Sequence, residues 1–410
     1  MKKAILVLLL FIATYINVSA DEEQTIKIGL LYGSAAVESV ELSFDGKCIT
    51  ANRDDIEDEK SYAAENNEIT VNGRRYRGRI ILKKNAEGKL NVINEANLED
   101  YVSAVISKEM SPDFEAEALK AQAVCARTYA AANKNKHAKH GFDVCAGVDC
   151  QVYFGMDAEH PKTIAAAKDT EGEILIYEGK PALTVYFATS GGHTEDAEFV
   201  WGTKIPYLKG VPDPFESEKC YAYRWTRSLS PEKAGQILEE NGYELGTIKS
   251  ITVEKVSDNG SVYALKVVGE KGEKIFTNEA CRTLFGYDVL LSQAYTVEKD
   301  EGVSVKAYKG SINTSNMYVL SAEGTTRYSG ETLYLEGSEK VSVETPQATG
   351  DFVFKGRGNG HLVGMSQNGA NAMAKAGISY DKILTYYYSG TEIEKPEPSE
   401  ARSNGELDGI

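Results

Sequence analysis

The sequence predicts an α+β fold that is rich in strands, with a central helix pair and an appended, mostly β region. Strand-like segments fill residues 26–90, two amphipathic patterns follow between residues 98 and 134, and strands return after residue 170. Because strands and helices come in separate runs, a doubly wound parallel sheet is not expected. A chain of 410 residues is long enough for more than one domain.

The composition is that of an acidic globular protein. Hydrophobic residues make up 42% and charged residues 26% of the chain, and the formal net charge is −16. Such a negative surface argues against nucleic-acid partners and against docking on anionic lipid. An anionic substrate would have to meet a local group of basic residues.

Residues 1–20 predict export. Lys2 and Lys3 precede an apolar run, and Val18-Ser19-Ala20 supplies small residues where signal peptidase cleaves. An uncleaved N-terminal anchor is the alternative, although the run is short for a full span. Both interpretations place the rest of the chain outside the cytoplasm, in the cell envelope or secreted.

The helix pair has clear local signals. Asn97 is expected to cap a first helix over residues 98–110, with Asp100 in its first turn. Ser111 and Pro112 are expected to end it and to begin a second helix, over about 113–134.

The chain is divided into a core over residues 21–212, an inserted β-rich region over 213–350, a return to the core over 351–395 and a polar tail over 396–410. The inserted region is expected to hold a helix from Pro231 and a hairpin that turns at Asp258-Asn259-Gly260.

Glu109 is the strongest candidate for acid–base chemistry. It continues the apolar stripe of Leu98, Val102 and Val105 along the first helix, although a lone glutamate on a helix is usually solvated. A carboxyl group beside apolar side chains has a raised pKa and can act as an acid near neutral pH. On the second helix, Lys120 and Arg127 share one face, either as solvated cations or as a wall for an anionic substrate.

Two glycine-rich segments predict close backbone approach to a ligand or tight structural turns. Their polar candidates are Ser190, Gly191, Gly192, Thr194 and Glu195 in the first segment, and His361, Ser366 and Gln367 in the second. A hydrolase triad is not expected from the first, nor a nucleotide loop from the second.

A cluster of His137, His140, Cys145 and Cys150 lies within fourteen residues. It could bind a structural zinc ion, with Asp149 as a further candidate ligand. In an exported protein, a Cys145–Cys150 disulfide is the alternative.

Three segments resemble the signature blocks of the stage II sporulation protein D and amidase-enhancer family. They read LEDYVSAVISKEM…EALKAQAVCARTYA, YFATSGGHTEDAEFVWG and GRGNGHLVGMSQNGA, in the family's order. The resemblance implies a peptidoglycan lytic transglycosylase that cuts between N-acetylmuramic acid and N-acetylglucosamine and leaves a 1,6-anhydro end. It implies a sporulation role in engulfment, with an amidase and a membrane protein as partners.

By the same resemblance, Glu109 is the catalytic acid and base, and Lys120 and Arg127 line the substrate groove with the polar residues of the two glycine-rich segments. No cofactor is needed for catalysis, because the muramyl 6-hydroxyl attacks within the substrate. Some clostridial members bind zinc at a similar segment, in which His137 matches the upstream ligand and Asp149 replaces a common histidine.

Two alternatives stay open. One is a non-catalytic wall-binding module that stimulates an amidase, which predicts that Glu109 does not matter. The other is a zinc-dependent wall hydrolase that uses His137, Cys145 and Cys150, although sites rich in cysteine are usually structural.

Overall fold

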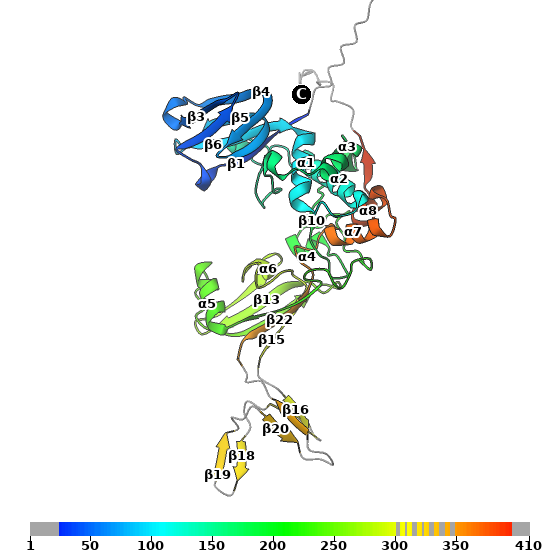
Figure 1. Ribbon diagram of the computed structural model, residues 1–410. Coiled ribbons are helices and arrows are strands. Elements are labelled where there is room, and N and C mark those ends of the chain that lie inside the picture. Colours follow the sequence, from blue (N-terminus) through cyan, green and yellow to red (C-terminus); the bar gives the residue numbers. More distant parts are fainter. Residues whose placement is uncertain are drawn as a thin grey trace, which may run out of the picture.

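The computed structural model describes residues 24–300 and 349–395, and the backbone of strands between 304 and 344. It has the predicted α+β class. In Figure 1, a sheet formed by the N-terminal part of the chain and a group of helices lie above a second β-rich unit. The predicted signal at residues 1–20 and the tail at 396–410 lie outside the described residues. No helix among the described residues is long and apolar enough to cross a membrane.

The N-terminal strands form one sheet in the order β3-β2-β4-β5-β6-β1-β7, as the strand pattern of residues 26–90 predicts. Its strands are β1 (Thr25–Leu31), β2 (Ser39–Phe44), β3 (Lys47–Asn52), β4 (Glu59–Val71), β5 (Arg74–Lys84), β6 (Leu90–Asn97) and β7 (Val144–Cys145). Strand β7 pairs in parallel with β1, so Cys145 lies at the sheet edge opposite Gly29.

Helix α1 (Leu98–Glu109) follows β6 directly, as predicted. The Asn97 side chain accepts a hydrogen bond from the Glu99 N–H at 2.7 Å and so caps the helix. Val102 and Val105 are fully buried in the larger of the two main cores. The helix therefore carries Glu109, its last residue, to the edge of that core.

Helix α2 (Ala116–Ala132) begins later than predicted. The Ser111 hydroxyl accepts the Asp113 N–H, and the Phe114 N–H donates to the Ser111 carbonyl, so residues 111–114 form a local turn. The alanines of α2 let other helices approach closely. These are α1, α3 (Pro161–Asp169), α7 (Gln367–Lys375) and α8 (Tyr380–Tyr387).

The second unit has its own core. It consists of β11 (Arg224–Leu229), α5 (Pro231–Glu240), β12 (Ile248–Val256), β13 (Val262–Gly269), β14 (Glu273–Thr277), α6 (Ala280–Thr283), β15 (Tyr295–Lys299) and β22 (Phe352–Arg357). The expected return to the first core at residue 351 comes too early, because Phe352 and Phe354 pack in the second core and β22 lies between β11 and β15. The expected helix from Pro231 and the β12–β13 hairpin are both present.

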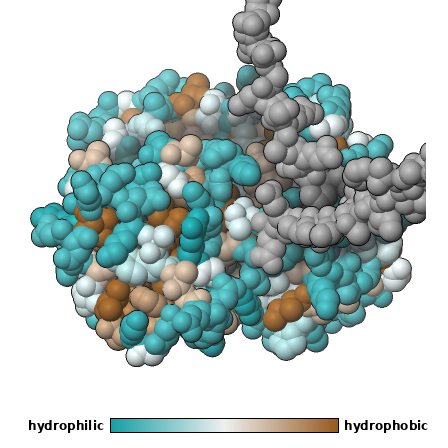
Figure 2. All heavy atoms as spheres, turned by 90° about the horizontal axis from the view of Figure 1, so that it is seen from above, coloured by the Kyte–Doolittle hydropathy of each residue, from teal (hydrophilic) through white to brown (hydrophobic). Residues whose placement is uncertain are grey.

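Short elements complete the architecture. They are β8 (Ile174–Tyr177), β9 (Lys180–Pro181), β10 (Tyr186–Phe187), α4 (Ala197–Trp201), β23 (Met365–Ser366), β24 (Glu392–Glu394), and the pairs β16 (Ser304–Ala307) with β17 (Gly310–Asn313), β18 (Tyr318–Ser321) with β19 (Gly324–Arg327), and β20 (Thr332–Leu335) with β21 (Val341–Glu344). Strands β10 and β23 pair in parallel and so join the two glycine-rich segments. The end of the molecule that carries the N-terminal sheet is mostly hydrophilic, with small scattered apolar groups (Figure 2).

Candidate active site and metal centre

Glu109 is half-buried at the C-terminal end of α1, where the loop after β7 passes over it. Its Oε1 accepts a hydrogen bond from the Val152 N–H at 3.0 Å. Burial raises the pKa of the Glu109 carboxyl, although that bond and one from the Tyr186 hydroxyl act in the opposite direction. The group therefore favours the protonated form more than an exposed glutamate does.

A chain of buried polar groups supports Glu109. The Tyr101 hydroxyl donates to Gln151 Oε1 at 2.9 Å, and Gln151 Nε2 donates to the Tyr186 hydroxyl at 3.0 Å. Because the Tyr186 oxygen accepts from Gln151, its own proton is available for the Glu109 carboxyl. Sequence reasoning missed Gln151 as a site residue and noted Tyr186 only as the first residue of the second block.

Lys120 lies away from this chain, in ion pairs with Glu117 and with Asp169 of α3, each at 3.2 Å. Its side chain is only partly exposed and bridges the two helices. Lys120 of α2 is therefore not in contact with Glu109 of α1.

The prediction that Arg127 lines a substrate groove is corrected by its position. Arg127 is 1% exposed. Its guanidinium binds both carboxylate oxygens of Glu99, at 2.7 and 2.5 Å, and the carbonyls of Ala167 and Glu173. Because these bonds use Nε, Nη1 and Nη2 of a buried cation, Arg127 holds helices together and is not exposed to a ligand.

The first glycine-rich segment is buried where the two units meet. Ser190 is fully buried, and Glu216 Oε2 accepts its N–H, its hydroxyl and the Gly191 N–H at 2.5–2.8 Å. Gly191 has a φ of 66°, and a Cβ there would lie 2.7 Å from the Arg357 side chain, while Gly192 has a φ of 106°. Close packing thus requires Gly191 and the backbone conformation requires Gly192, so the structure explains both glycines without the predicted ligand contact.

Thr194 and Glu195 also belong to this junction and are fully buried. The Thr194 hydroxyl exchanges hydrogen bonds with the Val211 backbone. Glu195 accepts from Ser257 at 2.6 Å and from Asn259 at 3.1 Å, both in the β12–β13 hairpin of the second unit. A buried carboxylate with these partners holds the two units together. The prediction that Thr194 and Glu195 line the substrate groove is therefore not met, because neither side chain is exposed to a sugar.

The second glycine-rich segment packs against the first. The His361 ring contacts Phe187 and Trp201, and burial lowers the pKa of the imidazole well below its ordinary range. Ser366 is buried and caps α7 through the Gly369 N–H. Gln367 is buried beside Gln122. The prediction that Ser366 and Gln367 contact a ligand is therefore corrected, because both side chains pack inside the protein.

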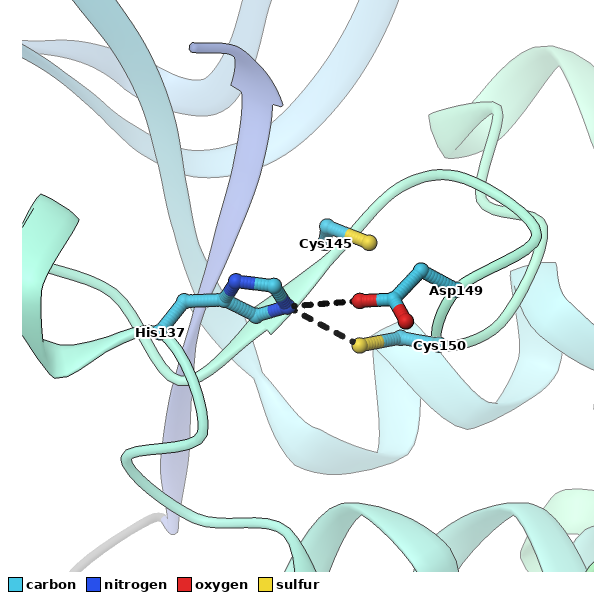
Figure 3. Close-up of side chains that lie close together, drawn as sticks. All are labelled: His137, Cys145, Asp149 and Cys150. Atoms are coloured by element: carbon cyan, nitrogen blue, oxygen red, sulfur yellow. Dashed lines mark hydrogen bonds and ion pairs between the residues drawn. The ribbon is translucent and has the colours of Figure 1, made fainter. Parts of the chain in front are cut away.

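Four side chains after α2 converge at the edge of the N-terminal sheet (Figure 3). They are His137, Cys145, Asp149 and Cys150, and their candidate ligand atoms all lie within 4.8 Å of one another. His137 Nε2 lies 3.3 Å from Cys150 Sγ and 3.3 Å from Asp149 Oδ2. Both cysteines are free thiols, so the structure does not contain the alternative disulfide.

The structure replaces His140 by Asp149 in this cluster. The His140 ring stacks against Phe142 and lies beside Tyr32, and it is not among the four converging side chains. Hydrogen bonding between the two thiols lowers the pKa of Cys145. A lower pKa favours the thiolate, which is the form in which a cysteine binds metal. Two sulfurs, one imidazole nitrogen and one carboxylate oxygen suit a tetrahedral Zn²⁺ ion with no open position.

Fold and site together define a two-unit protein with one candidate acid–base carboxyl and an adjacent four-residue cluster. Residues 86–177, which contain both, match the family model described as stage II sporulation protein, and residues 199–312 match a domain of unknown function. The chain is 30% identical to stage II sporulation protein D of Bacillus subtilis, over 73% of this chain and 75% of that protein. The chain therefore belongs to the stage II sporulation protein D family.

Two further relatives extend the comparison. An uncharacterised protein of Brachyspira hyodysenteriae is 31% identical, over 79% of this chain and 74% of its own length. The amidase enhancer of Bacillus subtilis is 28% identical over 71% of this chain, which covers 40% of that longer protein.

Proposed function

We propose that the protein is a peptidoglycan lytic transglycosylase and that Glu109 is its only catalytic carboxyl group. The observation that carries the proposal is the half-buried Glu109, whose pKa burial raises and which has the Tyr186 hydroxyl beside it. In the described part of the chain, the groups that hydrogen-bond the Glu109 carboxyl are the Val152 N–H and the Tyr186 hydroxyl, and neither is a carboxylate. A hydrolase normally needs two carboxylates, whereas attack by a hydroxyl of the substrate itself needs one.

In this mechanism, the Glu109 carboxyl donates its proton to the oxygen between N-acetylmuramic acid and N-acetylglucosamine, and the C1–O bond breaks. The muramyl C6 hydroxyl then bonds to C1 and gives its proton to the Glu109 carboxylate. The 1,6-anhydro end forms without consuming water, and the acid is restored. Val152 N–H and the Tyr186 hydroxyl stabilise the carboxylate between the two transfers.

The biological setting is part of the proposal. We place the protein outside the cytoplasm, acting on glycan strands without stem peptides during engulfment, beside an amidase and a membrane protein. The names of its relatives, a stage II sporulation protein and an amidase enhancer, support a sporulation role and a link to an amidase.

The test is mass spectrometry of glycan strands, with and without stem peptides, after incubation with the purified protein. Products with reducing ends lighter by one water molecule would establish transglycosylation. Glu109→Gln should lower the rate by about 10²–10⁴-fold in a folded protein. The matched control Glu57→Gln, an exposed glutamate near the N-terminal sheet, should leave the rate unchanged.

Two other results would redirect the assignment. Ordinary hydrolysed ends would require a second carboxylate and contradict the mechanism. Absence of cleavage, together with faster turnover of a partner amidase that does not depend on Glu109, would favour a non-catalytic enhancer.

We also propose that His137, Cys145, Asp149 and Cys150 hold a structural zinc ion, which would tie the loop beside Glu109 to the sheet edge. The purified protein should then contain one zinc per chain. Cys145→Ser should lose the metal and lower the thermal midpoint. Cleavage by a folded protein from which a chelator has removed all zinc would exclude a zinc-dependent hydrolase, whereas a normal midpoint after zinc loss would contradict the structural role.

A further inference from the structure

Two cations, one of them the sequence neighbour of Glu109, lie near one aromatic ring. The Arg74 guanidinium lies 4.1 Å from the centre of the Phe154 ring, and the Lys108 Nζ lies 4.7 Å from it. Arg74 begins β5, whereas Lys108 directly precedes Glu109 on α1. Phe154 thus gathers two positive charges from distant parts of the sequence, and each is stabilised by the ring face.

A hollow opens beside Arg74 and Phe154. It has a volume of about 430 Å³, and its wall includes Tyr32, Asn72, Arg74, Tyr76, Gly147 and Phe154. That volume is within the range of small-molecule sites. The loop that supplies Phe154 also supplies the Val152 N–H bound by Glu109, so the hollow and the carboxyl share one loop.

Neither cation has an acidic partner. No carboxylate forms an ion pair with Arg74 or Lys108 among the residues that the structure describes. Asp157 acts on Arg74 from a distance, but it binds the neighbouring Arg75 at 2.8 Å. Arg74 itself hydrogen-bonds the neutral Tyr76 hydroxyl. In a chain of net charge −16, two cations that share one ring and take part in no ion pair favour an anionic ligand.

We propose that Arg74 and Lys108, held on Phe154, bind the lactyl carboxylate of an N-acetylmuramyl residue and so position the glycan at Glu109. The inference rests on the proposed function. Arg127 is buried and paired and Lys120 is in ion pairs, so neither is as available for this anion. The planar guanidinium of Arg74 can take both carboxylate oxygens, and Lys108 adds a point charge.

Binding can be measured without cleavage in a Glu109→Gln background. The probe is glycan strands stripped of stem peptides and treated to remove phosphate polymers. Arg74→Gln and Lys108→Gln should each weaken binding about tenfold. Arg75→Gln, which removes the neighbouring cation that binds Asp157, should change it less than about twofold. Phe154→Leu should weaken binding with no loss of charge.

Amidating the muramyl carboxylates identifies the anion. Amidation should weaken binding of the Glu109→Gln parent about tenfold and should have little further effect on the Arg74 and Lys108 variants. If the parent and the folded variants bind strands with unmodified muramyl carboxylates equally well, the proposal is overturned. If the Arg74 and Lys108 variants bind more weakly than the parent only while phosphate polymers are attached to the strands, the bound anion is phosphate. That result would also overturn the proposal.

Failure of the proposed function has a different signature. If the native protein does not cleave strands but binding depends on Arg74, Lys108 and the muramyl carboxylate, the chemistry fails and the binding inference stands. If the parent binds no strands at all, the binding inference is overturned. Where cleavage does occur, the two variants should raise KM and leave kcat unchanged, because they remove binding that is the same in ground and transition states.

Discussion

The end of α1 and the junction around Ser190 both contain glutamates, yet the structure uses them in opposite ways. Glu109 is half-buried, takes few hydrogen bonds and has a raised pKa. Glu195 is fully buried and accepts bonds from Asp196, Ser257 and Asn259. A carboxyl that accepts few hydrogen bonds and is only partly buried is suited to proton transfer, whereas a fully buried one with both oxygens hydrogen-bonded is suited to a structural role.

The comparison also separates two uses of glycine. Gly191 and Gly358 lie where a Cβ would come within 2.7–2.8 Å of the facing backbone at the junction. Such close approach looks in a sequence like a ligand-binding loop, because both require a missing side chain. Here the approaching backbone belongs to the protein itself.

The largest effect should come from Arg127, which tests the claim that its role is structural. Arg127→Met leaves the Glu99 carboxylate without its cation and the carbonyls of Ala167 and Glu173 without a donor. We expect a loss of about 3–5 kcal/mol in the free energy of unfolding, measured with urea. A variant of normal stability that has lost glycan binding would restore Arg127 to the substrate groove.

Removing Glu195 should be the next most damaging change. Glu195→Ala leaves Ser257 and Asn259 without their acceptor and takes a negative charge from the buried Arg357. The free energy of unfolding should fall by about 2–4 kcal/mol. Glu109→Gln should by contrast leave it nearly unchanged, and equal losses in the two variants would erase the distinction drawn between the two glutamates.

The sequence predicts the end of α1 better than the junction around Ser190, for a physical reason. Asn97, the apolar stripe and Glu109 act within one helix, so local spacing predicts both the cap and the partly buried carboxyl. The candidate metal ligands lie close in sequence, so spacing predicts that His137, Cys145 and Cys150 converge, but it does not separate His140 from Asp149. Glu216 and Ser257, which bury the junction residues, come from loops that no local pattern connects to them.

Glu216 makes the junction sensitive to pH. Burial raises the pKa of its carboxyl to about 7, so the folded chain keeps a proton that the unfolded chain releases near pH 4.5. Stability should therefore fall as pH rises from about 4.5 to 7. Glu216→Gln cannot ionise and keeps an acceptor for Ser190 and Gly191, so it should be more stable than the native chain at pH 8, by roughly 1–2 kcal/mol.

Thermal midpoints of both proteins at pH 5 and pH 8 measure this difference. Asp213 has a raised pKa as well, and its charge contributes to the raised pKa of Glu216. The midpoint gap should widen at the higher pH. A constant gap would mean that the Glu216 carboxyl keeps its ordinary pKa in the folded chain.

The smallest effect is expected for Lys120, whose ion pairs with Glu117 and Asp169 are partly exposed. Because water and salt screen such pairs, Lys120→Gln should cost less than about 1 kcal/mol in the free energy of unfolding and should leave glycan affinity unchanged. Its matched partner is Lys108→Gln, which removes the same charge but should weaken binding about tenfold without changing stability. If Lys120→Gln instead weakens binding as much as Lys108→Gln, the anionic part of the glycan extends from the end of α1 to α2.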